Sequence, residues 1–404
     1  MKKNNEVVNN SVEFKGIITI ISSFLVMLCL GGIYTWSIFA VELTKASNFN
    51  YSYSQLVFGL LIAVFTISMT YGKKLLNFLK PSLIVTISGI LFFAGYFITY
   101  LSKGNIILIF TGISIFAGIA TGLGYLVSIS IPVLWFPLKK GLVLGIISGG
   151  FGAGSILLSY LSSYLFKTYD VFQTFLIIGI LYGCIIILFS LLVKKPNLNK
   201  DENINQVQSI NIKLLKDINF KKLFFSIFTG TFAGLMVIGN LKLIGLQYNI
   251  TNEILVLSVA LFSFANFLGR ITWGWLNDFV EGKILIPMSL FLIGLFTLLI
   301  GNIKLSDYLF VIISILTGFS FGANFVIYAR ETAHIYGVNN IGYIYPYVFL
   351  GYGISGIFGP VLGGALYDTT GNFKLSALIS FGICMIMAIL NIILNRKLNC
   401  KSSS

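Results

Sequence analysis

Long apolar stretches separated by short polar segments recur along the whole chain. A helix needs about 20 apolar residues to cross roughly 30 Å of hydrocarbon. The stretches are continuously apolar, whereas the strands of a membrane barrel alternate in polarity at every second residue. The pattern therefore predicts an all-α membrane protein with twelve transmembrane helices. These spans are expected at residues 16–42, 54–72, 82–102, 106–134, 141–166, 172–193, 223–247, 254–276, 283–301, 307–328, 341–366 and 375–395.

One longer polar segment divides the predicted spans. It runs from Lys194 to Lys222, includes the sequence PNLNKDENINQVQ, and contains no stretch that fits a span. Because it follows the sixth span, it predicts two six-helix halves joined by a loop. The expected organisation is an N-terminal half at 1–193, a central loop at 194–222 and a C-terminal half at 223–404.

The composition excludes several classes of protein. Hydrophobic residues make up 57% of the 404 and charged residues only 10%, whereas soluble domains are about one quarter charged. The sequence has one histidine and four cysteines without metal-ligand or redox spacing. It also has no Walker loop, HExxH or GxSxG motif. We therefore expect no enzyme activity, no metal and no cofactor, so any transport must use a solute gradient or exchange.

The net charge of +14 has two explanations. In a soluble protein it would suggest nucleic acid, but no basic face with interleaved aromatic residues lies outside the apolar stretches. With the N-terminus inside, twenty Lys and Arg residues fall in inside loops and five in outside loops. Cytoplasmic loops carry such an excess of cations. We therefore expect a multi-pass cell-membrane protein with cytoplasmic termini, lipid around it and no nucleic-acid partner.

Two glycine-rich spans occupy matching places in the two halves. The fifth span reads GLVLGIISGGFGAGS and the eleventh reads GYGISGIFGPVLGG. Small residues let helices approach closely in lipid, which supplies no hydrophobic drive between them. Repeated halves with such helices favour a transporter that alternates access between its two sides. Close packing without movement is the other explanation.

Arg270 is the leading candidate for a binding residue, since it lies in the apolar sequence FSFANFLGRITWGWLNDF. A buried arginine costs at least about 2.5 kcal/mol to insert, so it normally faces a cavity or a partner. Guanidinium binds a carboxylate through two hydrogen bonds and keeps its charge. The alternative is that Arg270 reaches the cytoplasmic surface or pairs with Asp278. Lys242 is a second cation within a span, which either binds substrate or extends outward, toward Glu253.

Aromatic side chains are the second group of candidate binding residues. Tyrosine hydroxyls can hydrogen-bond a carboxylate without adding charge, and aromatic rings can close a cavity to water. Ordinary packing or a belt at the membrane surface is the alternative. The candidates within or near span interiors are Tyr34, Trp36, Tyr125, Phe321, Phe325 and Tyr328.

Several motifs resemble the major facilitator superfamily and, within it, the oxalate/formate antiporter family of small-carboxylate transporters. They cover nearly the whole chain: GGIYTWSIF, WFPLKKGLVLGI, GGFGAGS, NFLGRITWGWLND, FGANFVIYA, GISGIFGPVLGG and YDTTGNF. The resemblance implies a major facilitator fold in which Arg270 binds substrate carboxylate. It also implies that the substrate pocket includes Tyr34, Tyr125, Phe151, Phe321, Phe325 and Gln55.

Two departures from the family pattern matter. Aligning on Gly359 and Pro360 places Tyr352 where the prototype oxalate transporter has a lysine, and no Lys or Arg occurs between 341 and 366. One central cation balances a monoanion better than a dianion. The loop motif with an acid four residues after a glycine is intact only at Gly274 to Asp278. We expect these two residues, with Gly359 and Pro360, to act in gating.

Taken together, the sequence predicts a secondary transporter of a small organic anion, a monocarboxylate such as formate, lactate or pyruvate. Alternating access by exchange is favoured over proton symport, because no Asp, Glu or His lies inside a span. The alternatives are an oxalate or dicarboxylate antiporter, a carrier of neutral or cationic solutes, a carboxylate sensor that moves nothing, and an intramembrane enzyme. We expect a monomer.

Overall fold

The computed structural model describes Lys2 to Ser402 apart from residues 137–139, 197–213, 215, 304 and 338–339. For 2–13, 140–142, 342–343 and 397–402 it describes the backbone alone. Regular structure in the described chain is entirely helical, as predicted. Most of the central loop predicted at 194–222 lies outside the described residues.

Twelve helices in the described chain are long and apolar enough to cross a membrane, which confirms the predicted number. Several run beyond their predicted ends; the first extends to Ser47 and the tenth to Tyr336. The first six spans consist of α1 (Lys2–Leu30), η1 (Gly31–Thr35), α2 (Trp36–Ser47), α3 (Tyr51–Gly72), η2 (Lys73–Asn77), α4 (Pro81–Leu101), α5 (Ile106–Ile109), η3 (Phe110–Ala117), α6 (Gly118–Ser130), η4 (Pro132–Leu134), α7 (Lys140–Leu165) and α8 (Val171–Ser190).

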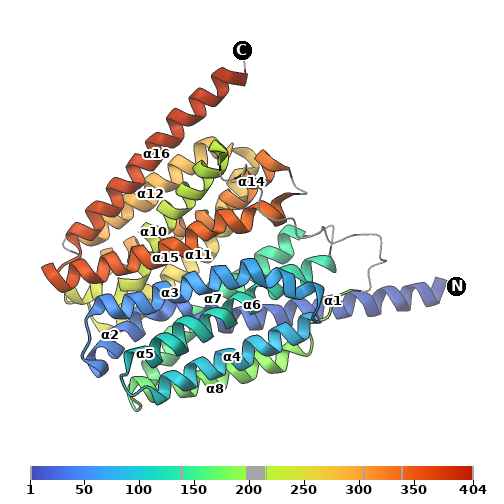
Figure 1. Cartoon of the computed structure of the whole chain (residues 1–404), viewed down its shortest axis with the longest axis horizontal. Coiled ribbons are helices and arrows are strands. Elements are labelled where there is room, and N and C mark those ends of the chain that lie inside the picture. The colour runs from blue at the N-terminus through green and yellow to red at the C-terminus, as the bar shows by residue number, and fades with distance from the viewer. Residues whose placement is uncertain are drawn as a thin grey trace.

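The last six spans lie together in the upper part of Figure 1, where the C-terminus is at the top and the N-terminus is at the right. Two of these spans have proline inside a helix: Pro287 in α12, and Pro346 and Pro360 in α15. The elements are α10 (Ile218–Gln247), α11 (Asn252–Phe279), α12 (Gly282–Asn302), α13 (Asp307–Gly322), η5 (Ala323–Phe325), α14 (Ile327–Tyr336), α15 (Ile341–Thr370) and α16 (Lys374–Ser402).

The first and tenth spans are interrupted in their middle by a tighter 3-10 turn. The turn in the first span is Gly31–Thr35, and the turn in the tenth is Ala323–Phe325. Irregular backbone at membrane depth is tolerated where it is buried in protein or lines a cavity. Tyr34 and Phe325 lie on these turns, so both breaks fall at predicted site residues.

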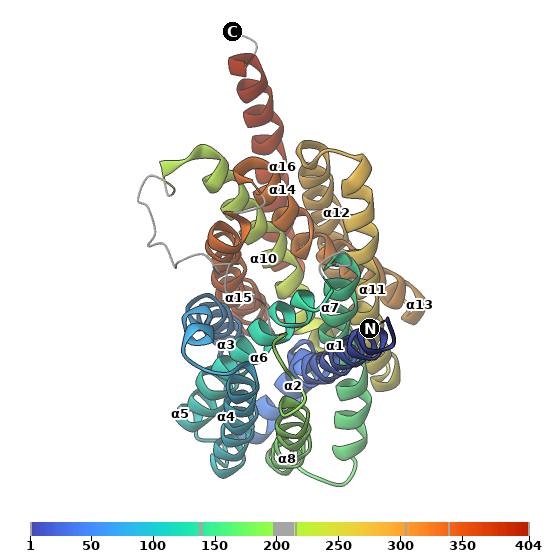
Figure 2. The same ribbon diagram turned by 90° about the vertical axis from the view of Figure 1, so that its right-hand side faces the viewer.

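Two helix pairs make the most extensive contacts between the first six spans and the last six: α3 lies along α15, and α7 along α11 (Figure 2). A Cβ atom at Gly59 would lie 2.7 Å from the Cα of Ile357, so glycine is needed where α3 crosses α15. The predicted glycine-rich fifth and eleventh spans therefore lie in the interface between the two sets.

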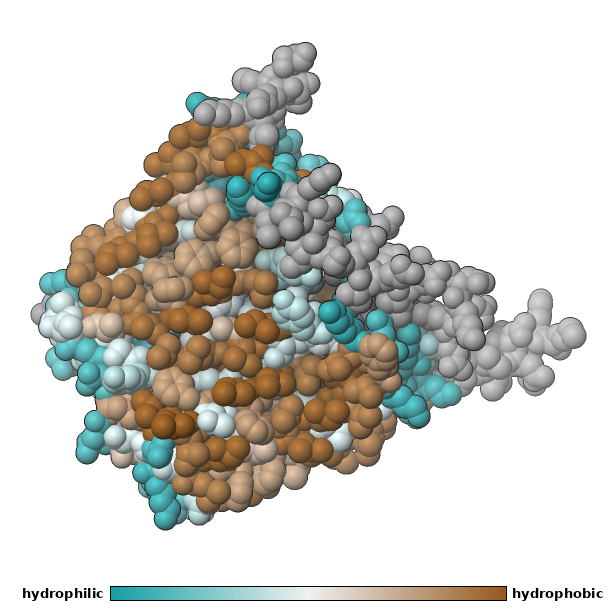
Figure 3. Space-filling view, in the orientation of Figure 1, coloured by the Kyte–Doolittle hydropathy of each residue, from teal (hydrophilic) through white to brown (hydrophobic). Residues whose placement is uncertain are grey.

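Large apolar side chains are exposed on the outside of the bundle, as the broad brown surface in Figure 3 shows. Hydrophilic residues gather toward its two ends. Leu188, Phe225 and Ile386 are each more than half exposed. A soluble monomer rarely exposes a large continuous apolar patch. This surface is that of a multi-pass membrane protein.

Candidate functional site

Close contact between α11 and α13 positions the candidate site. A Cβ atom at Gly322 would lie 2.9 Å from the backbone nitrogen of Arg270, so only glycine permits this approach. The contact places the aromatic residues at the end of α13 and in η5 beside the arginine. Arg270 itself is only 5% exposed.

The guanidinium of Arg270 is held by polar and aromatic neighbours. Its Nε donates a hydrogen bond to Oδ1 of Asn266 at 3.4 Å. Its Cζ lies 4.1 Å from the ring centroid of Phe325, an arrangement that attracts a cation to the face of the ring. No ion pair to Arg270 occurs among the described side chains, and Asp278 pairs with Arg330 at 3.5 Å instead. The alternative pairing of Arg270 with Asp278 is therefore wrong.

Three tyrosines from different spans surround this cation. The hydroxyls of Tyr34 and Tyr352 lie 3.2 Å apart, which links η1 to α15 across the two sets of spans. The side chains of Tyr34 and Tyr125 interact with the guanidinium of Arg270. A phenol is neutral, so these groups add hydrogen-bonding capacity near the arginine without adding a charge.

Phenylalanine rings fill the space between these residues. The ring of Phe151 lies 5.8 Å from that of Tyr34 and 5.1 Å from that of Tyr125. The ring of Phe321 lies 6.0 Å from Tyr34 and 5.1 Å from Phe325. We call the seven residues the central cluster: Arg270, Tyr34, Tyr125, Phe151, Phe321, Phe325 and Tyr352. All seven are among the residues that the sequence singled out.

Sequence reasoning missed four neighbours of the central cluster. The ring of Phe65 lies 5.2 Å from Tyr125, and the ring of Phe349 lies 5.1 Å from Tyr352. Tyr345 interacts electrostatically with Arg270. Asn266 is the fourth. Helical spacing could have found three of them, since Asn266 precedes Arg270 by one turn and Tyr345 and Phe349 share a face of α15 with Tyr352.

Besides Trp36, which lines a separate cavity, three predicted residues lie apart from the central cluster. Tyr328 is buried beside Ser226 and Cys384, residues of α10 and α16. Nε2 of Gln55 donates a hydrogen bond to the carbonyl oxygen of Gly239 at 2.9 Å. Lys242 is the third, and its Nζ lies 3.1 Å from Oε1 of Glu42.

The expectation that Lys242 extends toward Glu253 is wrong. Its side chain is 6% exposed and pairs with Glu42, which lies on α2. Glu42 also lies 3.6 Å from Lys45, one turn further along the same helix. A buried ammonium needs a carboxylate partner, and the close approach of α2 to α10 supplies one from the first six spans.

Further polar contacts cross between the two sets of spans at the same end of the molecule, away from the termini. The carboxylate of Asp368, near the end of α15, accepts hydrogen bonds from the backbone nitrogens of Tyr51 and Ser52 at 3.1 and 2.9 Å. These are the first residues of α3, so an acid from one set caps a helix of the other. We call the Glu42–Lys242 and Asp368–α3 contacts the far-end contacts.

The four residues expected in gating lie on two helices. Gly274 and Asp278 are on α11, and none of the described side chains from elsewhere in the chain lies within 4 Å of a Cβ atom built at Gly274. Gly359 packs against the backbone of Phe232, and the carbonyl of Pro360 accepts a hydrogen bond from Nδ2 of Asn240 at 3.2 Å. These two residues therefore lie where α15 packs on α10.

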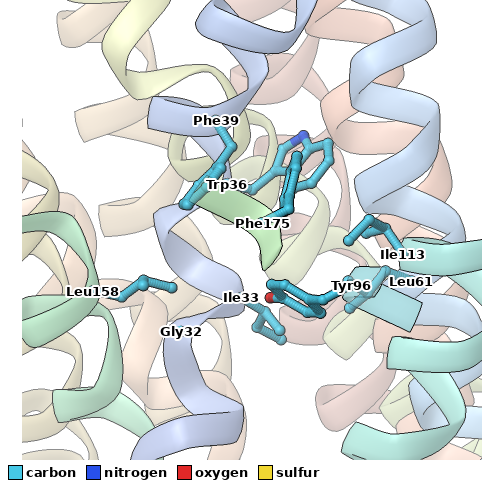
Figure 4. A pocket seen from close by; sticks show the side chains of 9 residues that line it. All are labelled: Gly32, Ile33, Trp36, Phe39, Leu61, Tyr96, Ile113, Leu158 and Phe175. Carbon is cyan, nitrogen blue, oxygen red and sulfur yellow. The ribbon is translucent and has the colours of Figure 1, made fainter. Parts of the chain in front are cut away.

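A small cavity inside the first six spans is distinct from the central cluster (Figure 4). Its lining is apolar apart from the polar tips of Trp36 and Tyr96, so it offers nothing to neutralise an anion. Among the described residues, no group of three His, Cys, Asp or Glu could hold a metal ion. The lining residues are Gly32, Ile33, Trp36, Phe39, Leu61, Tyr96, Ile113, Leu158 and Phe175.

Known proteins share both this sequence pattern and this fold. The chain is 28% identical over 346 residues to an uncharacterised MFS-type transporter, YhjX, of Escherichia coli (strain K12), covering 84% of this chain and 85% of that protein. It is 21% identical over 373 residues to the oxalate:formate antiporter of Oxalobacter formigenes, covering 90% and 88%. It is 25% identical over 190 residues to apicoplast pyruvate carrier 1 of Toxoplasma gondii, covering 37% and 35%.

A solved structure of a variant of the nucleoside transporter NupG has the same fold, with a TM-score of 0.74 at 15% sequence identity, covering 94% of this chain and 99% of that one. The family model of the Major Facilitator Superfamily matches residues 17–258 and 223–398. These matches confirm the resemblance that the motifs indicated. The chain belongs to the major facilitator superfamily of membrane transporters.

Proposed function

We propose that this protein is a secondary transporter of a small monocarboxylate, of the size of formate, lactate or pyruvate. The observation that carries the proposal is the central cluster: a buried arginine without an ion-pair partner among the described side chains, surrounded by phenols and phenyl rings. A buried charge is stable only with a partner, and a bound carboxylate would supply one.

The proposed binding mode follows from the donors around Arg270. A carboxylate accepts two parallel hydrogen bonds from the guanidinium and further bonds from the hydroxyls of Tyr34, Tyr125 and Tyr352. Binding would replace the hydrogen bond between Tyr34 and Tyr352, which now joins the two sets of spans. The phenyl rings would exclude water and so strengthen these interactions.

The number of cations argues for one negative charge on the substrate. Arg270 is the only cation in the central cluster, and aligning on Gly359 and Pro360 places Tyr352 where the prototype oxalate transporter has a lysine. A second carboxylate would be buried without a charged partner, which is costly. Two relatives are named for small carboxylates, one for oxalate and formate and one for pyruvate, which supports the class.

We propose alternating access as the mechanism, with residues 1–193 and 223–404 as the two moving halves, 194–222 as their link and the gating residues at their boundary. Exchange is favoured over proton symport, because an empty carrier would have to reorient with an unpaired buried arginine. The excess of Lys and Arg in alternate loops supports cytoplasmic termini in the cell membrane. The monomer is the proposed working unit, since both halves of the site lie on one chain.

Counterflow into proteoliposomes tests the proposal. Labelled pyruvate or formate outside should accumulate when the same unlabelled anion is inside, which a sensor or an enzyme cannot achieve. Arg270→Gln should reduce uptake by about 100-fold, since it removes one partner of a buried charge pair. Lys283→Gln, an exposed cation that pairs with Glu281, is the matched control and should keep full uptake.

Any of three outcomes would overturn the proposal. Full carboxylate uptake by Arg270→Gln would remove the arginine from the site. Uptake of neutral or cationic solutes but of no carboxylate by the unaltered protein would assign it to another substrate class. Uptake of oxalate alone would favour the dicarboxylate antiporter instead.

A further inference from the structure

Asn266 is a buried polar residue at the site that the proposed function does not use. Its side chain is 0% exposed and lies on α11, one helical turn before Arg270. Oδ1 of its carboxamide accepts the hydrogen bond from Nε of Arg270. Its other polar atom, Nδ2, is buried without a hydrogen-bond partner among the described residues.

A buried amide nitrogen without a partner costs free energy, so native structures rarely keep one without a reason. Ser263, one turn earlier on α11, shows the ordinary solution, since its hydroxyl bonds the carbonyl of Val259 in its own helix. The two polar atoms of Asn266 share one carbon. With Oδ1 directed to Nε of Arg270, Nδ2 therefore lies beside the guanidinium, where a substrate oxygen could accept its hydrogen.

We propose that Asn266 is a specificity-determining residue that selects monocarboxylates with an oxygen on the carbon next to the carboxylate, that is, 2-oxo and 2-hydroxy acids. This inference rests on the proposed function. Arg270 binds the carboxylate, Oδ1 of Asn266 fixes the orientation of the guanidinium, and Nδ2 donates to the adjacent keto or hydroxyl oxygen. Acetate and formate lack that oxygen and leave Nδ2 unsatisfied.

The test compares pyruvate with acetate, which differ at this carbon, by measuring counterflow of each into proteoliposomes. The unaltered protein should transport pyruvate with at least tenfold higher efficiency than acetate, since a site built to bond an oxygen rejects the analogue that lacks it. Asn266→Leu, of similar volume, removes both polar atoms, so uptake of both anions should fall, but pyruvate uptake should fall much more and most of the preference should be lost. Ser263→Ala is the matched control on the same helix and should keep the preference.

A second variant separates a role in binding from a role in folding. Asn266→Asp places a carboxylate beside Arg270, so it should reduce uptake of both anions by competing for the guanidinium. Thermal unfolding should show the variant at least as stable as the unaltered protein, because the new charge pair replaces an unpaired cation.

The outcomes distinguish this inference from the proposed function. If no monocarboxylate is transported, the proposed function fails. If monocarboxylates are transported but pyruvate and acetate are handled equally, or if Asn266→Leu keeps the tenfold preference for pyruvate, only the role of Asn266 is overturned.

Discussion

At the residue scale, Tyr352 is a neutral side chain beside Arg270, and it leaves Arg270 as the only cation of the central cluster. Its side chain is fully buried, its hydroxyl bonds that of Tyr34, and its ring lies 5.4 Å from Phe325. A cation at this position would be within the central cluster and would face the carboxylate that we propose Arg270 binds. The residue is therefore the place to change the preferred number of charges on the substrate.

Tyr352→Lys should convert the preference from monoanions to dianions. Without a dianion the variant carries two buried cations, so its melting temperature should fall below that of Tyr352→Phe, the control that removes only the hydroxyl. Oxalate should raise the melting temperature of Tyr352→Lys, since a ligand that binds only the folded state stabilises it. If oxalate stabilises the unaltered protein as strongly, the proposal of a single-charge site is wrong.

At the element scale, the far-end contacts join helices of the two sets. Lys242 on α10 is 6% exposed, whereas its partner Glu42 on α2 is 28% exposed and also contacts Lys45. Removing the Glu42 carboxylate therefore leaves a buried ammonium, whereas removing the Lys242 ammonium leaves a partly exposed carboxylate.

Glu42→Gln should destabilise the protein more than Lys242→Met. The first change leaves a buried ammonium without a carboxylate, which typically costs about 3 kcal/mol or more. The second leaves a partly exposed carboxylate that Lys45 still contacts. Melting temperatures in detergent should follow this order, and the double variant should recover toward the value of Lys242→Met. Equal losses for the two single variants would contradict the pairing described here.

Asp368 caps α3 from the other set of spans, so it should hold the far end closed. Asp368→Ala removes a helix cap, a change that usually costs about 1 kcal/mol, or about fivefold in an equilibrium. A cysteine at the buried Ser54, in a chain with its native cysteines replaced, should then react about fivefold faster with a maleimide reagent that cannot cross the membrane. Asp307→Ala, an acid at the start of α13, is the control and should leave the rate unchanged.

At the scale of the whole molecule, the sequence predicted the membrane-spanning helices better than it predicted the contacts between side chains. Twelve continuous apolar stretches predicted twelve spans, since length and composition alone decide whether a helix can cross lipid. The breaks at Gly31–Thr35 and Ala323–Phe325 were not predicted, because both sequences stay apolar through the turn. Lys242 was assigned the wrong partner because Glu42 lies 200 residues away along the chain.

The attachment of α13 to α11 has a consequence for the transport cycle. Arg270, Phe321 and Phe325 are held together by glycine contacts within the last six spans, whereas Tyr34, Tyr125 and Phe151 belong to the first six. A carboxylate bound to Arg270 would move together with the last six spans. Its distance from Tyr34 and Tyr125, which belong to the first six spans, would change. Any difference in affinity between the inward and outward states would then arise from those N-terminal residues, which makes them the place to change the affinity for substrate on one side of the membrane relative to the other.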